Sequence, residues 1–160
     1  MADAQPNGSL GGLPGGPTSA VLFCCTQNAL RSPMAAAMLR QLHGQRIFVD
    51  SVGVRAGELD PFAVAAMDEI GLDITRHKPR TFDDLEDSSF DLIISLSPEA
   101  QHKAVEMTRT MACEVEFWNT FDPSIVEGSR EQRMDAYREV RDGLMRRIRE
   151  RFPAMGAPKI

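Results

Sequence analysis

Four short apolar runs alternate with longer stretches of helical character, and this alternation constrains the fold more than any other feature. The runs cover residues 20–25, 47–51, 90–96 and 115–118. Most are almost continuously apolar, as strands are when helices cover both faces of a parallel sheet. Val115 and Phe117 flank Glu116, a pattern typical of an edge strand. We therefore expect an α/β fold: a single three-layer domain with a four-stranded parallel sheet flanked by helices, built from right-handed βαβ units.

Capping residues and apolar spacing predict the helices. Ser32 before Pro33 and Asp60 before Pro61 pair a capping side chain with a proline, which predicts helices over about 32–42 and 60–71. A third helix is expected after Ser97. The last helix carries an apolar residue at every third or fourth position, at Met134, Tyr137, Val140, Leu144, Ile148 and Phe152. We interpret its many arginines as a solvated face.

Composition and charge exclude several classes of protein. The length of 160 residues fits one domain, and three cysteines without a C-x-x-C pair argue against a disulfide scaffold or a thiolate zinc site. No apolar run reaches 18 residues, and the first twenty residues lack an export signal. A net charge of −5 without a basic run disfavours nucleic-acid binding. We expect a cytoplasmic monomer or weak dimer with no metal, no cofactor, and no nucleic-acid or membrane partner.

The amino-terminal segment differs in composition from the rest of the chain. Residues 1–18 are rich in glycine and proline and contain no aromatic residue, so they cannot bury enough surface to offset the entropy of ordering. We expect a disordered extension over 1–18, a folded domain over 19–155 and a short tail over 156–160.

The segment between the first strand and the first helix carries the most chemistry. Cys25 ends the strand, and Arg31 and Ser32 open the helix. Backbone N–H groups and the helix dipole of such a loop can hold an oxyanion of phosphate size, and Arg31 can bind two of its oxygens. The same donors favour a thiolate at Cys25. The candidate phosphate-binding residues between them are Thr26, Gln27, Asn28, Ala29 and Leu30.

Two further cysteines and one aspartate complete the candidate chemistry. Cys24 falls on the opposite face of the strand from Cys25, so we interpret it, like Cys113, as a small buried apolar residue. Phosphoryl transfer to a thiolate needs a proton for the departing oxygen. Asp122, which follows the last strand and precedes Pro123, is the best candidate for this acid, although Asp-Pro is also common turn chemistry.

Together these features resemble the low-molecular-weight protein tyrosine phosphatase family, whose fold also contains the thioredoxin-type arsenate reductases. The loop is similar to the family pattern C-x-G-N-x-x-R-S, and the resemblance continues through residues 50–53, 71–74 and Asp122-Pro123. It implies a phosphatase-like catalytic domain in which Cys25 is the nucleophile, Arg31 the phosphate clamp and Asp122 the general acid. Ser32 would donate to the thiolate.

The resemblance also assigns supporting residues. Asn28 would adopt a left-handed backbone conformation, which asparagine tolerates, and Ser51 and His77 would hydrogen-bond its side chain. The chain departs from the family at Gln27, where a glycine is usual, and at Leu30, where many relatives have a second cysteine. The loop 55–59 and the residues after Pro123 offer no aromatic side chain to a phenyl ring.

Three functions therefore remain open. The first is hydrolysis of a phosphorylated protein or a small phosphomonoester through a cysteinyl-phosphate intermediate. The second is thiol-dependent arsenate reduction, because arsenate matches phosphate in shape and charge, although no resolving cysteine occurs near Ser97. The third is a non-catalytic phosphate-sensing module. The sequence favours the hydrolase.

Overall fold

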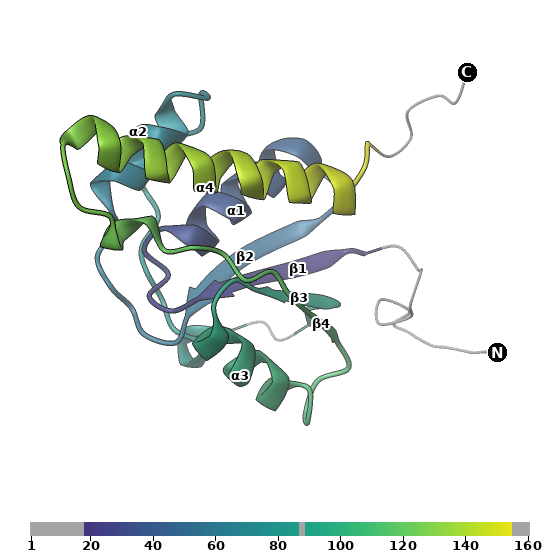
Figure 1. Cartoon of the computed structure of the whole chain (residues 1–160). Helices are drawn as coiled ribbons and strands as arrows, with labels where there is room; N and C mark the ends of the chain where they lie inside the picture. Colours follow the sequence, from purple (N-terminus) through teal and green to yellow (C-terminus); the bar gives the residue numbers. More distant parts are fainter. Residues whose placement is uncertain (1–17, 87–88, 155–160) are drawn as a thin grey trace, which may run out of the picture.

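The computed structural model describes residues 18–86 and 89–154 (Figure 1). The predicted extension over 1–18, apart from Thr18, and the predicted tail over 156–160 lie outside the described residues. The strands are β1 (Ala20–Cys25), β2 (Phe48–Gly53), β3 (Leu92–Ser95) and β4 (Glu114–Phe117). The helices are α1 (Arg31–His43), α2 (Pro61–Asp68), α3 (Pro98–Met107) and α4 (Arg130–Arg151), with 3₁₀ turns η1 (Phe82–Asp84) and η2 (Pro123–Ile125).

All four strands are parallel and lie in the order β2-β1-β3-β4, which confirms the predicted sheet. The register brings the carboxyl ends of the strands to one edge, because Cys25 pairs with Gly53 and Ser95 pairs with Phe117. Strand β2 lies beside β1 on one side and β3 lies beside β1 on the other, so the direction in which strands are added to the sheet reverses after β2. Ligands of open α/β sheets bind at such a reversal of strand order.

Helices cover both faces of the sheet, as Figure 1 shows: α1, α2 and α4 on one side and α3 on the other. Successive side chains of β1 point alternately into two hydrophobic cores, one on each face of the sheet. Val21, Phe23 and Cys25 face the core under α1 and α4, whereas Leu22 and Cys24 face the smaller core under α3. The predicted apolar stripe of α4 is buried along its whole length. The edge strand β4 is only half-buried, as its alternating pattern predicts.

The prediction that Ser32 caps the first helix is wrong. Helix α1 begins at Arg31, and Leu30 occupies the N-cap without a side-chain hydrogen bond. The reason is that the Ser32 hydroxyl lies 3.0 Å from the Cys25 sulfur instead. The predicted cap Asp60 is confirmed, since it accepts from the N–H of Phe62. Helix α3 begins after Ser97 as predicted, and Ser97 accepts from the N–H of Ala100. Helix α2 ends at Asp68, earlier than predicted.

The arginines of α4 are less solvated than the sequence suggests. Arg141 is buried, donating to the carbonyl of Ala66 at 2.8 Å and to Glu69 at 2.8 Å. Arg138 contacts Glu69 at 2.7 Å, so the two arginines join α4 to the end of α2. The sequence could not reveal this pairing because its partners lie about 70 positions away.

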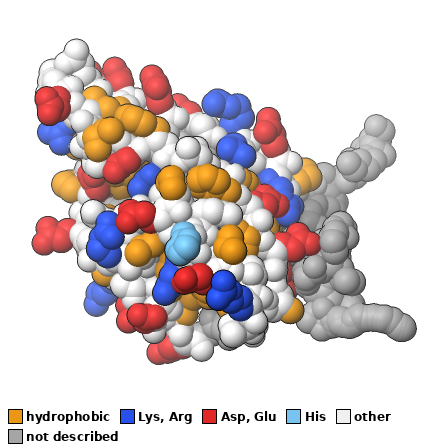
Figure 2. All heavy atoms as spheres, turned by 60° about the horizontal axis from the view of Figure 1, so that its bottom comes forward, with side chains coloured by type: hydrophobic (Ala, Val, Ile, Leu, Met, Phe, Trp, Pro, Cys, Tyr) orange, Lys and Arg blue, Asp and Glu red, His pale blue; other side chains and the backbone are white. Residues whose placement is uncertain are grey.

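Charged side chains are mixed on the outer surface. Figure 2 brings the α3 side of the molecule forward, and basic and acidic side chains are interspersed there with scattered hydrophobic ones. Among the residues that the structure describes, no helix has the length and apolar character needed to cross a lipid bilayer.

Candidate active site

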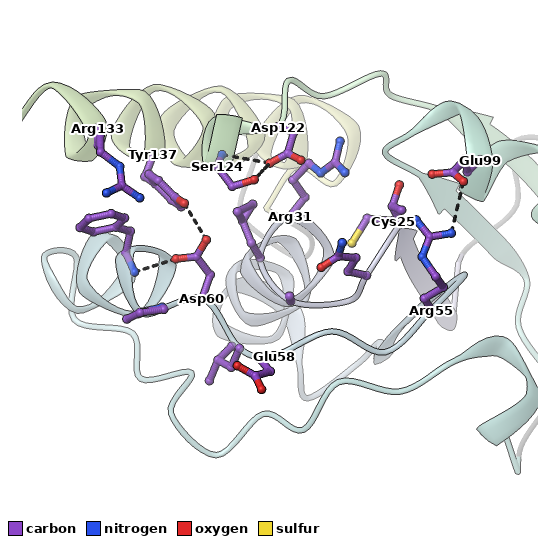
Figure 3. Close-up of a pocket in the computed structure, with 17 residues that line it drawn as sticks. Cys25, Arg31, Arg55, Glu58, Asp60, Glu99, Asp122, Ser124, Arg133 and Tyr137 are labelled. Atoms are coloured by element: carbon purple, nitrogen blue, oxygen red, sulfur yellow. Dashed lines mark hydrogen bonds and ion pairs between the residues drawn. The ribbon is translucent and has the colours of Figure 1, made fainter. Parts of the chain in front are cut away.

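The loops that follow all four strands border a single pocket with a volume of about 580 Å³ (Figure 3). The loop after β1 supplies six of the lining residues, namely Cys25, Thr26, Gln27, Ala29, Leu30 and Arg31. Arg55 and Glu58 come from the loop after β2, Glu99 from the start of α3, and Asp122 from the loop after β4. The three predicted catalytic side chains, Cys25, Arg31 and Asp122, thus border the same cavity.

The sulfur of Cys25 lies at the base of this pocket and is supported from behind. Ser32 Oγ is 3.0 Å from Cys25 Sγ, and Asn28 Nδ2 lies 2.9 Å from the same hydroxyl. Since Asn28 donates to Ser32 Oγ, the single hydroxyl proton of Ser32 can go to the sulfur or to the Val52 carbonyl oxygen, which lies farther away at 3.4 Å. The arrangement is suited to stabilising a thiolate.

Asn28 is fully buried, and its φ of +55° is the left-handed conformation that the resemblance implied. Its Nδ2 also donates to Ser51 Oγ at 3.0 Å, and its Oδ1 accepts from the N–H of Arg80 at 2.9 Å. His77 Nε2 lies 3.0 Å from Oδ1 and 2.9 Å from the Asn28 carbonyl oxygen. Because both partners are acceptors, Nε2 carries the proton.

The environment of His77 opposes a second proton on the ring. Burial lowers the pKa of His77 and the neighbouring charges of Arg40 and Arg80 lower it further, although the Asn28 carbonyl and Asp50 act in the opposite direction. The imidazole therefore serves the loop as a neutral donor at neutral pH.

The segment after β2 runs beside the phosphate loop and fixes its shape through backbone hydrogen bonds. The carbonyls of Cys25, Thr26, Gln27 and Ala29 each accept an N–H from residues 54–60. Gly53 allows this approach, because a Cβ there would lie 2.6 Å from the Asn28 nitrogen. Gln27, which replaces the usual family glycine, has its side chain over Gly57, and among the described residues Asn28 alone of the non-glycines has a positive φ.

Arg31 and the candidate acid are structurally linked. Arg31 is buried, and its Nη1 donates to the carbonyl oxygen of Thr120 at 2.9 Å, two residues before Asp122. Asp122 Oδ1 accepts from the N–H of Ser124 at 3.0 Å and from its hydroxyl at 2.7 Å. Asp122 thus caps a turn and also lines the pocket. The interpretation of Asp122-Pro123 as a turn is therefore compatible with Asp122 as the candidate acid.

Sequence reasoning missed the aromatic side chains of the pocket. Tyr137 of α4 lines it at the end away from Cys25 (Figure 3), and the ring of Phe62 of α2, which also lines it, has its centroid 5.3 Å from that of Tyr137. Tyr137 donates to Asp60 at 2.6 Å, and the Arg133 guanidinium lies 4.3 Å from the centre of the Phe62 ring. We name this group of Asp60, Phe62, Arg133 and Tyr137 the outer chamber.

The remaining candidates lie away from the pocket. Cys24 is fully buried on the α3 side of the sheet, and burial raises the pKa of its thiol. Cys113 is only half-buried, against the same core, so the expectation of full burial is wrong for it. Within residues 18–86 and 89–154, no group of three or more His, Cys, Asp or Glu side chains could hold a metal ion.

The fold and this loop define a class of phosphate-handling α/β proteins, and comparison with known sequences identifies the family. Residues 20–155 match the family described as low molecular weight phosphotyrosine protein phosphatase. The chain belongs to this family.

Two named relatives and one solved structure are similar to this chain. Arsenate reductase of Bacillus subtilis (strain 168) is 33% identical over 130 residues, which are 81% of this chain and 92% of that protein. Arsenate reductase of Bacillus licheniformis is 35% identical over 136 residues, 85% of this chain and 96% of that protein. The tyrosine phosphatase AmsI of Erwinia amylovora superposes with a TM-score of 0.72 at 17% identity, covering 91% and 98% of the two chains, and so shares the fold.

Proposed function

We propose that this chain is a phosphomonoester hydrolase that acts through a cysteinyl-phosphate intermediate. The observation that carries the proposal is the convergence of Cys25, Arg31 and Asp122 on one pocket, with Ser32 within 3.0 Å of the sulfur. A nucleophile, an anion clamp and an acid are the three groups that phosphoryl transfer to a thiolate requires.

In the first step the Cys25 thiolate attacks phosphorus in line with the leaving oxygen. The sulfur–phosphorus bond forms, the phosphorus–oxygen bond to the leaving group breaks, and Asp122 gives its proton to the departing oxygen. Arg31 and the loop N–H groups hold the charge on the equatorial oxygens. In the second step Asp122 takes a proton from water, which displaces the sulfur, and Ser32 donates to the departing thiolate.

The outer chamber supports an organic leaving group. The half-buried Phe62 ring provides apolar surface in the pocket and packs against the buried Tyr137 ring, and Leu59 also lines the pocket. Aromatic rings contact one another favourably in tilted or offset arrangements. We therefore include phosphotyrosyl peptides and aryl phosphates among the substrates.

Variants of the catalytic residues test the mechanism. Cys25→Ser should abolish turnover of an aryl phosphate, and Asp122→Ala should slow it by about 10²–10⁴, as expected for loss of a general acid. Cys113→Ser and Asp83→Ala are matched controls, because both residues lie outside the pocket, and both should retain wild-type rates. Turnover that persists in Cys25→Ser would rule the mechanism out.

Arsenate reduction is the second candidate, favoured by the names of the relatives at 33–35% identity. Arsenate could bind the same loop, and Cys25 would form a sulfur–arsenic bond with loss of water. An external thiol would then attack the Cys25 sulfur, releasing arsenite and leaving a mixed disulfide that a second thiol reduces, so two thiols are oxidised for each As(V). The thiols must be external, because Cys25 alone of the three cysteines borders the pocket.

One side-by-side experiment separates the candidates. Rates are compared for an aryl phosphate, a phosphotyrosyl peptide, and arsenate with thioredoxin or a small thiol. Hydrolysis without arsenate-dependent thiol consumption supports the phosphatase, whereas the reverse supports the reductase. Phosphate binding with neither activity would point to the sensing module. Either enzyme needs a reduced Cys25, which fits a cytoplasmic location.

A further inference from the structure

A second cavity lies behind the phosphate loop and is basic. It has a volume of about 430 Å³ and is separate from the catalytic pocket, with which it shares no lining residue. Four cationic side chains line it, Arg40, Arg76, Lys78 and Arg80, together with His77 and two carboxylates, Asp50 and Asp73. We name this cavity the basic basin. Its excess of positive charge contrasts with the net charge of −5 of the chain.

The two carboxylates offset only part of the positive charge of the basin, because four cationic side chains line it. Asp50 Oδ1 pairs with Arg80 and also accepts from the N–H of Ser51 at 2.8 Å. Asp73 Oδ1 accepts from the N–H and the hydroxyl of Thr75 at 2.8 and 2.6 Å, and these bonds lower the pKa of Asp73. Four cations thus face two carboxylates, and the basin keeps an excess of positive charge.

Three of the cations have donors to spare. In the part of the chain that the structure describes, Arg76 and Lys78 make no hydrogen bond or ion pair, and Arg40 donates only to the carbonyl of Val49, at 3.0 Å. Burial and the nearby charge of Arg80 lower the pKa of Arg40, although Asp50 opposes them. Cations that converge on a concave surface in excess of the carboxylates there attract a multiply charged anion.

The basin is joined to the catalytic loop through one side chain. His77 lines the basin, and its Nε2 lies 2.9 Å from the carbonyl oxygen and 3.0 Å from the Oδ1 of Asn28. Arg40 and Arg80 of the basin oppose protonation of this imidazole, and Asp50 favours it. A bound anion would offset the two cations and favour the protonated imidazolium, whose charged N–H is a stronger donor to Asn28.

We propose that the basic basin binds a small oxyanion with two or more negative charges, such as pyrophosphate, and that the bound anion acts on the phosphate loop through His77. The volume exceeds that of a single phosphate group, and cavities of this size accept small organic ligands. A phosphorylated small molecule is thus the class of ligand that the basin fits.

Calorimetric titration with pyrophosphate tests binding once the catalytic loop is blocked. Cys25 is carboxymethylated in the full-length Cys113→Ser protein, which blocks the phosphate loop. Any pyrophosphate that still binds must then occupy another site. We expect one equivalent of pyrophosphate to bind, and Arg76→Glu with Lys78→Glu to weaken binding at least tenfold, which is about 1.4 kcal/mol. Arg109→Glu with Arg149→Glu makes the same charge change at exposed arginines outside the basin and should leave binding unchanged.

Nuclear magnetic resonance of the histidine rings tests the connection to the loop. Pyrophosphate should raise the titration midpoint of His77 by about half a unit in the blocked protein, and not in the Arg76→Glu, Lys78→Glu variant. His43 and His102, which lie outside the basin, serve as internal references. No binding to the blocked protein, or equal losses in both double variants, would overturn the site. Binding with an unchanged His77 midpoint would overturn its action on the loop.

Discussion

Replacing Asn28 by alanine tests whether the phosphate loop depends on one buried side chain. The Asn28 amide makes four hydrogen bonds, to Ser32, Ser51, His77 and Arg80, and the residue has no exposed surface. Truncation leaves the buried Ser51 hydroxyl and the part-buried Arg80 N–H without these partners, and each unsatisfied group costs about 1–3 kcal/mol. Alanine in a left-handed conformation adds about 1–2 kcal/mol. The expected loss of unfolding free energy is therefore about 3–8 kcal/mol.

Urea unfolding followed by fluorescence of Trp118, the single tryptophan, measures this loss. A loss of that size is a large part of the 5–15 kcal/mol typical of a domain, so the transition should move to much lower urea. Turnover of an aryl phosphate should fall as well, because Ser32 loses the donor that orients its hydroxyl toward Cys25.

Two control substitutions at the same position separate the contributions. Asn28→Gly also loses the four hydrogen bonds but carries no penalty for a positive φ, so it should be about 1–2 kcal/mol more stable than Asn28→Ala. Asn28→Asp keeps the acceptor oxygen but places a negative charge near the Cys25 sulfur. Its loss of aryl-phosphate turnover, expressed as a free energy, should therefore exceed its loss of unfolding free energy. A loss below 1 kcal/mol in Asn28→Ala, or equal stability of the alanine and glycine variants, would refute the reasoning.

Two further predictions concern other positions. Hydrogen bonds from Arg138 and Arg141 lower the pKa of Glu69 to about 2, so its contribution to stability is present above the unfolded value near 4.3 and is lost as the pH falls toward 2. Thermal unfolding of Glu69→Gln should thus show a lower Tm than wild type at pH 7, and a gap that closes in acid. Gly53→Ala should lower the free energy of unfolding in urea by about 3 kcal/mol, because its Cβ would meet backbone atoms. Gly57→Ala is the control: the atoms nearest its Cβ belong to the Gln27 side chain, so the loss should stay below about 1 kcal/mol. Equal losses in the two variants would contradict this account.

The features that the sequence predicts well depend on local spacing. The continuous apolar character of β1 and the stripe on α4 fix which faces are buried, and the structure confirms both. Residues with two competing local uses are harder to assign. Ser32 precedes a proline and looks like a helix cap, but its hydroxyl is engaged by the Cys25 sulfur. A capping pattern alone cannot reveal this competition, because the sulfur belongs to the preceding strand.

The outer chamber was not predicted from the sequence because its aromatic residues lie on helices, and the same placement bears on specificity for the leaving group. The loop after β2 and the residues after Asp122 lack aromatic side chains, so the sequence suggested a pocket without them. Phe62 and Tyr137 reach the pocket from α2 and α4, where each also fits an ordinary helical apolar pattern. The phosphate loop is held by backbone partners in residues 54–60 and by Asn28, and of the outer chamber Asp60 contributes its backbone N–H, which donates to the Ala29 carbonyl. Substitutions at Phe62 and Arg133, which make no hydrogen bond to the loop within the described part of the chain, can therefore change the preferred leaving group while the phosphoryl-binding geometry stays intact.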